Sequence, residues 1–278
     1  MEDYMKMHTY GEKAVHQNFG IGFKNLNILI GIDDKKYLIT FRRMARHMSH
    51  GIFVVLEGAD RVGKTTQALL LAKALSEITH KETLSVKFPD RDTPLGRQLD
   101  SYLSGNGDIN KHALHLLFTA NRWERQSEIR KAISNGIPVV ADRYIYSGIA
   151  YTAAKSPPTP NWEWCWEMEK GLVEPDLVIC LTPGNLDELS SRNGYGNERY
   201  ENDDFQKRVL ENYVRISKDV ELDNKDNNDE NDSVGLWHFI QATDKTIEEV
   251  HKCIMVLVKS KLESIIGPEI HECTNKKD

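Results

Sequence analysis

The stretch LEGADRVGKTTQ (residues 56–67) decides the fold of this chain. It contains the pattern G-x-x-x-x-G-K-[ST], which follows the apolar run IFVVLE (52–57) and precedes an amphipathic segment. A strand, a glycine turn and a helix in this order place a nest of backbone N–H groups at a helix N-terminus, where phosphate binds. We therefore expect a nucleoside triphosphate to bind here. The predicted nucleotide-binding residues are Gly58, Ala59, Asp60, Arg61, Val62, Gly63, Lys64, Thr65 and Thr66.

Two side chains of this loop have roles that the pattern predicts, and a third is unexpected. Lys64 is expected to neutralise the outer phosphates, and the Thr65 hydroxyl is expected to ligate Mg²⁺. Asp60 places a carboxylate in a site for anions, where phosphate would repel it. Asp60 therefore requires a partner other than the triphosphate.

Further apolar runs predict the rest of a sheet. They are LSVKF (84–88), IPVVA (137–141), LVICL (177–181) and LWHFI (236–240). Amphipathic stretches separate these runs, and the alternation predicts an α/β fold in which helices cover both faces of a five-stranded parallel sheet. The longest predicted helix spans 111–134 and ends at an Asn-Gly pair.

Composition narrows the class of protein. The chain has 278 residues, of which 40% are apolar and 28% charged, and its net charge is −6. These values predict a soluble protein with one large catalytic domain and no general attraction to nucleic acid. No apolar run approaches the roughly 20 residues needed to span a bilayer, so we expect no membrane partner. The four cysteines show no CxxC spacing, which argues against a zinc site or a disulfide framework and favours a cytoplasmic location. A nuclear or mitochondrial pool is the alternative, although acidic residues near the N-terminus argue against an import signal.

Three segments fall outside the predicted core. Residues 1–48 are expected to be an N-terminal extension before a catalytic domain at 49–265, and residues 266–278 a C-terminal tail. The tract ELDNKDNNDENDSVG (221–235) is an acidic insertion with too little apolar surface to fold by itself. We expect it to form a solvated loop.

Two motifs are candidates for binding a second substrate. In FPDRDTPLG (88–96), Arg91 follows a predicted strand, so its guanidinium would reach the crevice where parallel sheets bind ligands. In FTANRWER (118–125), Phe118, Asn121, Arg122 and Arg125 share one helical face, as recognition of a flat heterocycle requires. Each motif also has a structural alternative: Arg91 as a surface residue, and Phe118 as part of the core.

The end of the run IPVVA carries a third motif. Asp142 and Arg143 follow it directly, which places the first near a metal and the second near phosphate. Ser147 and Tyr151 lie four residues apart on the next predicted helix. A buried acid that caps this helix is the alternative role for Asp142.

A glycine-containing segment, SRNGYGNERYENDDFQ (191–206), is expected to provide a lid at about 191–200. Arg192 and Arg199 flank its glycines, so the segment can close over a reacting phosphoryl group. A surface turn is the alternative. A GTPase of the Ras type is excluded, because the nearest match to its NKxD motif, at 224–227, fails at the last position.

Taken together and in this order, the motifs resemble the thymidylate kinases of eukaryotic type, a family of P-loop nucleoside monophosphate kinases. The resemblance runs from about Gly51 to Val258 and includes LEGADRVGKTTQ, FPDR, HLLFTANRWE, DRYIYSG, PDLV and GNERYENDDFQ. It implies ATP with Mg²⁺ as phosphoryl donor, dTMP as acceptor, dTDP as product for dTTP synthesis, and a homodimer. Neither the N-terminal extension nor the acidic insertion has a counterpart in the family pattern.

The resemblance also implies roles for single residues. Arg91 and Arg143 would hold the acceptor phosphate, Phe118 would stack on thymine, and Arg122 with Ser147 would bond its edge. Tyr151 would crowd a ribose 2′-hydroxyl, and Asp60 would accept a hydrogen bond from the 3′-hydroxyl of dTMP. Arg192, with the segment ATDKT (242–246), would lie against adenine. The remaining acceptor-site residues would be Phe88, Gly148, Tyr200 and Gln206. The implied catalytic residues are Arg61, Lys64, Asp142, Arg143 and Arg199, and the implied metal-site residues are Thr65 and Asp142.

Two alternatives to this function remain open at the level of the sequence. One is another pyrimidine-directed P-loop kinase, and the other is a nucleotide-binding regulator without turnover.

Overall fold

The computed structural model describes residues 50–184, 199–226 and 234–266. The predicted N-terminal extension, most of the predicted lid including Arg192, and residues 267–278 of the predicted tail lie outside these ranges.

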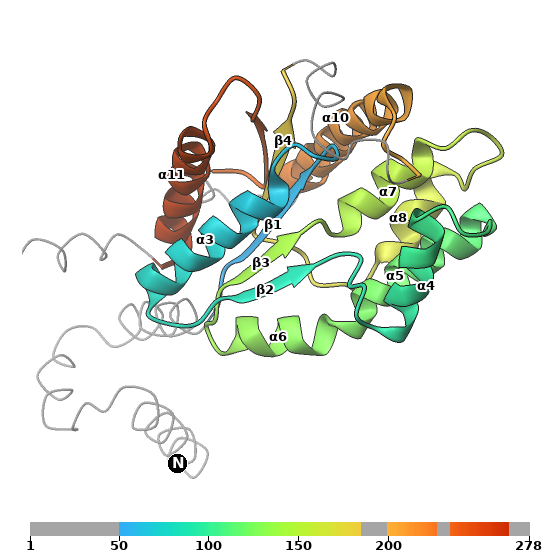
Figure 1. Cartoon of the computed structure of the whole chain (residues 1–278). Helices are drawn as coiled ribbons and strands as arrows, with labels where there is room; N and C mark the ends of the chain where they lie inside the picture. Colours follow the sequence, from blue (N-terminus) through green and yellow to red (C-terminus); the bar gives the residue numbers. More distant parts are fainter. Residues whose placement is uncertain (1–49, 185–198, 227–233, 267–278) are drawn as a thin grey trace, which may run out of the picture. The chain divides into compact units, whose positions relative to one another are not determined.

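The core of the described chain is a sheet of five parallel strands (Figure 1). Its strands follow the order β2-β3-β1-β4-β5. They are β1 (Phe53–Gly58), β2 (Leu84–Lys87), β3 (Val139–Asp142), β4 (Leu177–Thr182) and β5 (Trp237–Gln241). The prediction of an α/β fold with a five-stranded parallel sheet is confirmed, and β1 lies at its centre.

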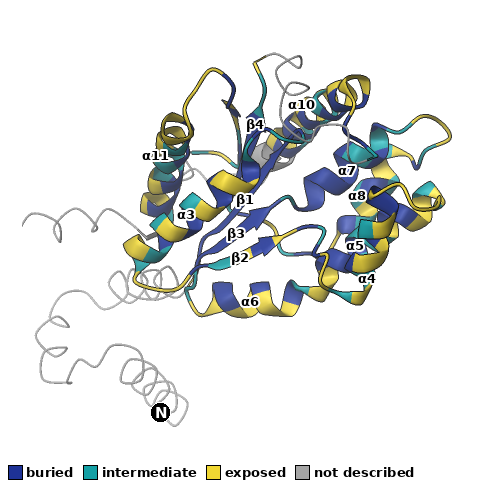
Figure 2. Cartoon of the chain, viewed as in Figure 1, coloured by how far each residue is buried: buried dark blue, intermediate teal, exposed yellow. Residues whose placement is uncertain are grey.

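Helices cover the sheet on both faces. On one face lie α3 (Lys64–Thr79) and α11 (Ile247–Ile266). The other face carries α4 (Pro94–Leu103), α5 (Lys111–Glu124), α6 (Gln126–Ser134), α7 (Ile145–Ala153), α8 (Trp162–Glu169) and α10 (Asp203–Asp226). Along β1, Phe53 and Val55 pack into the second layer, while Val54 and Leu56 pack into the first. Burial on both faces explains why the three central strands, β3, β1 and β4, are nearly continuous apolar runs, whereas the edge strands β2 and β5 are only partly buried (Figure 2).

The predicted helix at 111–134 is two helices, so the prediction of one continuous helix is wrong. The chain breaks at Arg125, which ends α5 and precedes α6. The Arg125 guanidinium binds Asp90, with Nε 2.6 Å from Oδ2, and the next side chain, Gln126, donates to the Tyr144 hydroxyl at 2.8 Å. Contacts with distant residues therefore override the helical pattern.

The acidic tract at 221–235 also differs from the prediction at its start. Residues 221–226 continue α10 instead of forming a loop. Val220 is buried just before them, and a helix anchored in this way can extend through polar residues. Among the described helices, none combines the length and the apolar composition needed to cross a membrane.

Candidate active site

A cavity of about 360 Å³ lies at the carboxyl ends of the central strands. It brings together residues that lie far apart in the sequence. Its lining includes the predicted residues Asp60, Arg61, Lys64, Thr65, Phe88, Arg91, Phe118, Arg122, Asp142, Arg143, Ser147, Gly148, Tyr151 and Tyr200. Most of the predicted site therefore forms one cleft.

The loop between β1 and α3 has the conformation that phosphate binding requires. Gly58 and Gly63 have φ angles of 132° and 102°, and a Cβ at Gly58 would lie 2.1 Å from the Leu181 carbonyl oxygen. Only glycine fits that position. Lys64 is buried, and its Nζ donates to the Ala59 carbonyl oxygen. Burial and Arg143 lower the pKa of Lys64 to about 8, against the opposing effect of Asp60.

Thr65 and Asp142 are suited to a Mg²⁺ site. The Thr65 hydroxyl donates to Asp142 Oδ2 at 2.5 Å, so a neutral oxygen and a carboxylate lie side by side at the phosphate loop. Mg²⁺ prefers oxygen ligands and uses one or two protein groups together with phosphates and water. The described residues contain no group of three or more His, Cys, Asp or Glu that could hold a metal alone. The pair fits a metal that arrives with a nucleotide.

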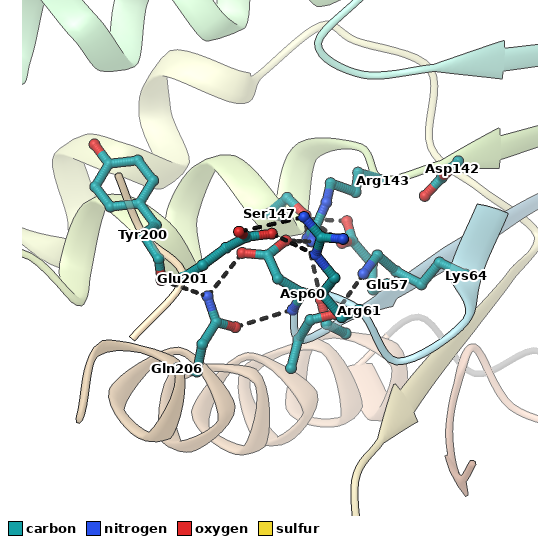
Figure 3. Close-up of polar contacts among 12 residues, drawn as sticks. Glu57, Asp60, Arg61, Lys64, Asp142, Arg143, Ser147, Tyr200, Glu201 and Gln206 are labelled. Atoms are coloured by element: carbon teal, nitrogen blue, oxygen red, sulfur yellow. Dashed lines mark hydrogen bonds and ion pairs between the residues drawn. The ribbon is translucent and has the colours of Figure 1, made fainter. Parts of the chain in front are cut away.

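Asp60 has two partners in the protein, which answers the question that its position raises. One carboxylate oxygen, Oδ1, binds Arg143 Nη2, and Oδ2 accepts from Gln206 Nε2 at 2.7 Å (Figure 3). Burial acts to raise the pKa of Asp60, but Arg143 and Lys64 hold it below the ordinary value. The negative charge is therefore compensated before any ligand binds.

Arg143 is fixed by several acceptors. Its Nη1 donates to the Gly58 carbonyl oxygen at 3.0 Å and to Ser147 Oγ at 3.1 Å. The guanidinium also lies 5.0 Å from the centroid of the Tyr151 ring. Its backbone has φ of 70°, a conformation that is uncommon outside glycine and that clusters at functional sites.

Ser147 lines the cleft, where its hydroxyl is already hydrogen-bonded within the protein. Its hydroxyl donates to Glu57 Oε2 and accepts from Arg143. Because a hydroxyl has one hydrogen to donate, Ser147 is bonded within the Arg143 network and not free to donate to a base. Its contact with the thymine edge stays a prediction that would require this network to rearrange.

Glu57 is a buried acid behind the site for which the motifs predicted no role. It is fully buried and accepts hydrogen bonds from the backbone N–H groups of Tyr144 and Ser147, each at 3.0 Å, and from the Tyr213 hydroxyl at 3.0 Å. It thereby holds the N-terminus of α7 against β1. One signal was visible: Glu57 is the only charged residue in the run IFVVLE.

The predicted base-recognition face of α5 separates into two parts. Phe118 and Arg122 line the cleft. Asn121 instead binds the backbone of Asp90, accepting from its N–H at 2.7 Å and donating to its carbonyl oxygen at 3.1 Å, and Arg125 binds the Asp90 carboxylate. These two residues hold the loop after β2, which carries Arg91.

Three more of the predicted arginines, in addition to Arg122, Arg125 and Arg143, are paired with acids in this structure. Arg91 lines the cleft and lies 2.6 Å from Asp100, and Arg61 Nε lies 2.7 Å from Glu201 Oε1. Arg199 is not among the residues that line the cleft: it binds Asp108 at 2.6 Å and the Gly107 carbonyl oxygen at 2.7 Å. Arg199 therefore does not lie at its predicted catalytic position in this structure. Asp108 and Gly107, in the connection between α4 and α5, accept its hydrogen bonds instead.

Tyr200 and Glu201, just before α10, line the cleft, and the first turn of α10 contacts the phosphate loop. Gln206 joins both sides, since its Nε2 donates to the Tyr200 carbonyl oxygen at 2.9 Å and its Oε1 accepts from the Asp60 N–H at 3.0 Å. Tyr200 lies 6.0 Å from Tyr151, ring to ring. Lys155, which the motifs missed, lines the cleft beside Tyr200, and burial lowers its pKa to about 7.

Comparisons with known proteins point to one family. The sequence pattern of the thymidylate kinase family matches residues 56–254. The thymidylate kinase of Homo sapiens is 39% identical over 214 residues, covering 77% of this chain and 92% of that protein. That of Dictyostelium discoideum is 37% identical over 218 residues, covering 78% and 89%. The solved thymidylate kinase of Candida albicans is 33% identical, with a TM-score of 0.64 over 77% of this chain and 94% of that one.

Proposed function

Because the chain belongs to the thymidylate kinase family, we propose that it transfers the γ-phosphoryl group of ATP to dTMP, giving dTDP for dTTP synthesis. One observation carries this proposal. A phosphate loop and a predicted nucleotide-acceptor site, with Phe118, Arg122 and Arg143, line the same cleft. A donor and an acceptor bound there would meet at Arg143, between the loop and α7.

The residues of the cleft indicate how transfer proceeds. The attacking oxygen belongs to an anionic phosphate, so no protein base is needed to create the nucleophile. Catalysis then rests on positioning and on stabilising charge at the transferring group, which Lys64, Arg61 and Arg143 are placed to supply. A Mg²⁺ ion held by Thr65 and Asp142 would neutralise charge on the donor phosphates. Arg61 would exchange its partner Glu201 for the phosphoryl group.

A panel of acceptors tests the function. Purified protein with Mg-ATP is expected to give its highest kcat/KM with dTMP, against dCMP, UMP, CMP and dGMP. Preference for UMP or CMP would identify another pyrimidine kinase. ATP binding without turnover of any acceptor would identify a nucleotide-binding regulator.

The affinity for ATP is expected to fall as pH rises through about 8. The pKa of Lys64 is about 8 without ligand. A bound triphosphate raises this pKa, so binding takes up a proton at higher pH, and affinity then falls by up to about tenfold per pH unit. Calorimetry at pH 8.5, in buffers of different ionisation enthalpy, measures the uptake.

The variant Lys64→Arg is the control, because an arginine stays charged over this pH range. Lys155, whose pKa is also lowered, is still present in this variant, so a pH dependence that disappears with Lys64→Arg belongs to Lys64. An affinity of the wild-type protein that stays constant from pH 7 to pH 9 would contradict the assignment.

We also propose a homodimer that forms through the outer face of α5. Leu116 and Trp123 are seven residues apart, hence on one helical face, and are 44% and 45% exposed. Large apolar side chains exposed together mark interaction surfaces. Leu116→Glu is expected to convert the dimer to monomers in analytical ultracentrifugation.

Leu69→Glu is the matched control for the dimer, because Leu69 is 64% exposed but lies on α3, across the sheet. A wild-type protein that is monomeric at micromolar concentration, or a Leu116→Glu protein that stays dimeric, would refute this interface.

A further inference from the structure

Three helices meet behind the cleft around one buried carboxylate. Glu169 is the last residue of α8 and is 4% exposed. Its Oε2 accepts from Arg122 Nε at 3.0 Å, its Oε1 accepts from Arg122 Nη2, and the Thr119 hydroxyl donates to Oε1 at 3.0 Å. The arginine and the threonine belong to α5, so α8 holds a side chain that α5 presents to the cleft.

The contacts of Arg122 leave one amino group for a ligand. Nε and Nη2 both bind Glu169, and Nη2 also binds Thr119 at 3.2 Å. Nη1 makes no hydrogen bond with any residue in the described ranges. Since a guanidinium is planar and rigid, two bonds to one carboxylate fix its plane and the direction of Nη1.

The residues around the ion pair of Arg122 and Glu169 leave its charges balanced and give it room. His115 Nε2 lies 3.5 Å from Glu169, but burial and Arg122 lower the pKa of His115 to about 4, so this ring is neutral and Arg122 balances the carboxylate. Gly148 on α7 leaves room for the pair. A Cβ there would lie 2.6 Å from Arg122 Nη2 and 2.8 Å from Glu169 Oε1.

We propose that Glu169 is a positioning residue that sets base specificity. It holds Arg122 so that Nη1 donates to the C4 carbonyl oxygen of the pyrimidine, which thymine has and cytosine replaces with an amino group. An arginine can only donate hydrogen bonds, so the fixed guanidinium favours thymine, which offers an acceptor at C4, over cytosine, which offers a donor there. This inference rests on the proposed role of Arg122 in reading the base.

The variant Glu169→Gln tests the inference directly. It keeps the shape of the side chain but removes the charge and one of the two acceptors. The selectivity, defined as kcat/KM for dTMP divided by kcat/KM for dCMP, is expected to fall at least about tenfold, because a charged hydrogen bond to the base is lost. The loss should appear mainly in KM for dTMP, while KM for ATP stays unchanged.

Two control variants separate this effect from damage to the fold. Glu167→Gln breaks an exposed ion pair with Lys170 on the same helix and should keep the wild-type selectivity. Val258→Ala destabilises the core on the other face of the sheet and should lower the melting temperature but not the selectivity. Loss of selectivity in either control would show that the ratio reports general damage and would overturn the inference.

A second variant tests the inference if the Glu169→Gln protein does not fold. Gly148→Ala keeps both partners of the pair and pushes on Arg122 and Glu169 through its methyl group. This variant is expected to lower the selectivity in the same direction. Unchanged selectivity in a folded Gly148→Ala protein would count against the inference.

A double-mutant cycle distinguishes the positioning role of Glu169 from the base-reading role of Arg122 on which it rests. Arg122→Met should lower the selectivity, and adding Glu169→Gln to it should change the ratio by no more than about twofold. If Arg122→Met leaves the ratio unchanged, the base-reading role of Arg122 fails, and the inference fails with it. If Arg122→Met lowers the ratio but Glu169→Gln does not, the inference alone fails. Additive losses would show that Glu169 acts independently of Arg122.

Discussion

Replacing Arg61 with alanine is expected to lower turnover by about 10³-fold while the affinity for dTMP stays within a few-fold. The reason is that the partner of this guanidinium is charge that develops only during transfer, and such an interaction affects kcat more than binding. Steady-state kinetics gives kcat, and calorimetry with dTMP gives the affinity. A fall in affinity without a fall in turnover would make Arg61 a ground-state binding residue.

The ion pair between Arg61 and Glu201 supplies the matched control. Glu201→Gln removes the same pair, which has a nitrogen–oxygen distance of 2.7 Å, but leaves the guanidinium in place. This variant is expected to keep most of the turnover. If it loses as much turnover as Arg61→Ala, the pair itself, and not the arginine at the phosphoryl group, is what transfer requires.

Replacing Asp60 with asparagine is expected to lower the affinity for dTMP by about 10- to 100-fold, since a charge-assisted hydrogen bond contributes about 1.5–3 kcal/mol. The affinity for ATP is expected to fall much less. Both oxygens of Asp60 already have protein partners, Arg143 and Gln206. Each carboxylate oxygen can accept a second hydrogen bond, so the 3′-hydroxyl of dTMP can still be bound. The substitution also disturbs Arg143, which is proposed to hold the acceptor phosphate.

A cycle with a 3′-deoxy analogue of dTMP isolates the sugar contact. The disturbance of Arg143 affects both acceptors equally and cancels in the comparison. If Asp60 binds the 3′-hydroxyl, the two losses cannot add, because removing either group removes the same bond. Purely additive losses would refute the contact, and rescue of the variant by raised Mg²⁺ would point to a role at the metal.

The sequence was sufficient for those parts of the structure that depend on local pattern. Strands buried on both faces are continuous apolar runs, and the phosphate loop needs its glycines at fixed positions, so both could be predicted. The helix break at Arg125 could not, because Asp90, 35 residues away, determines it. The position of Arg199 depends in the same way on Asp108, 91 residues away.

The buried acids of the site show the same limit. Glu57 and Glu169 act on Ser147 and Arg122, at sequence separations of 90 and 47 residues. No spacing rule for a single helix or strand connects such residues, and a lone acid in an apolar run carries no sign of its partner. The partners of these two acids follow only from the packing of α5, α7 and α8.

The two hydrogen bonds between Asp60 and Gln206 have a consequence for how the binding sites communicate. One bond uses the backbone N–H of the phosphate loop, and the other uses the side chain of the residue proposed to hold the acceptor sugar. A displacement of the loop on donor binding would therefore act on the first turn of α10, and a displacement of that turn would act on the loop. Coupling of this kind is reciprocal by thermodynamic necessity: whatever one nucleotide does to the affinity for the other is returned by the same factor.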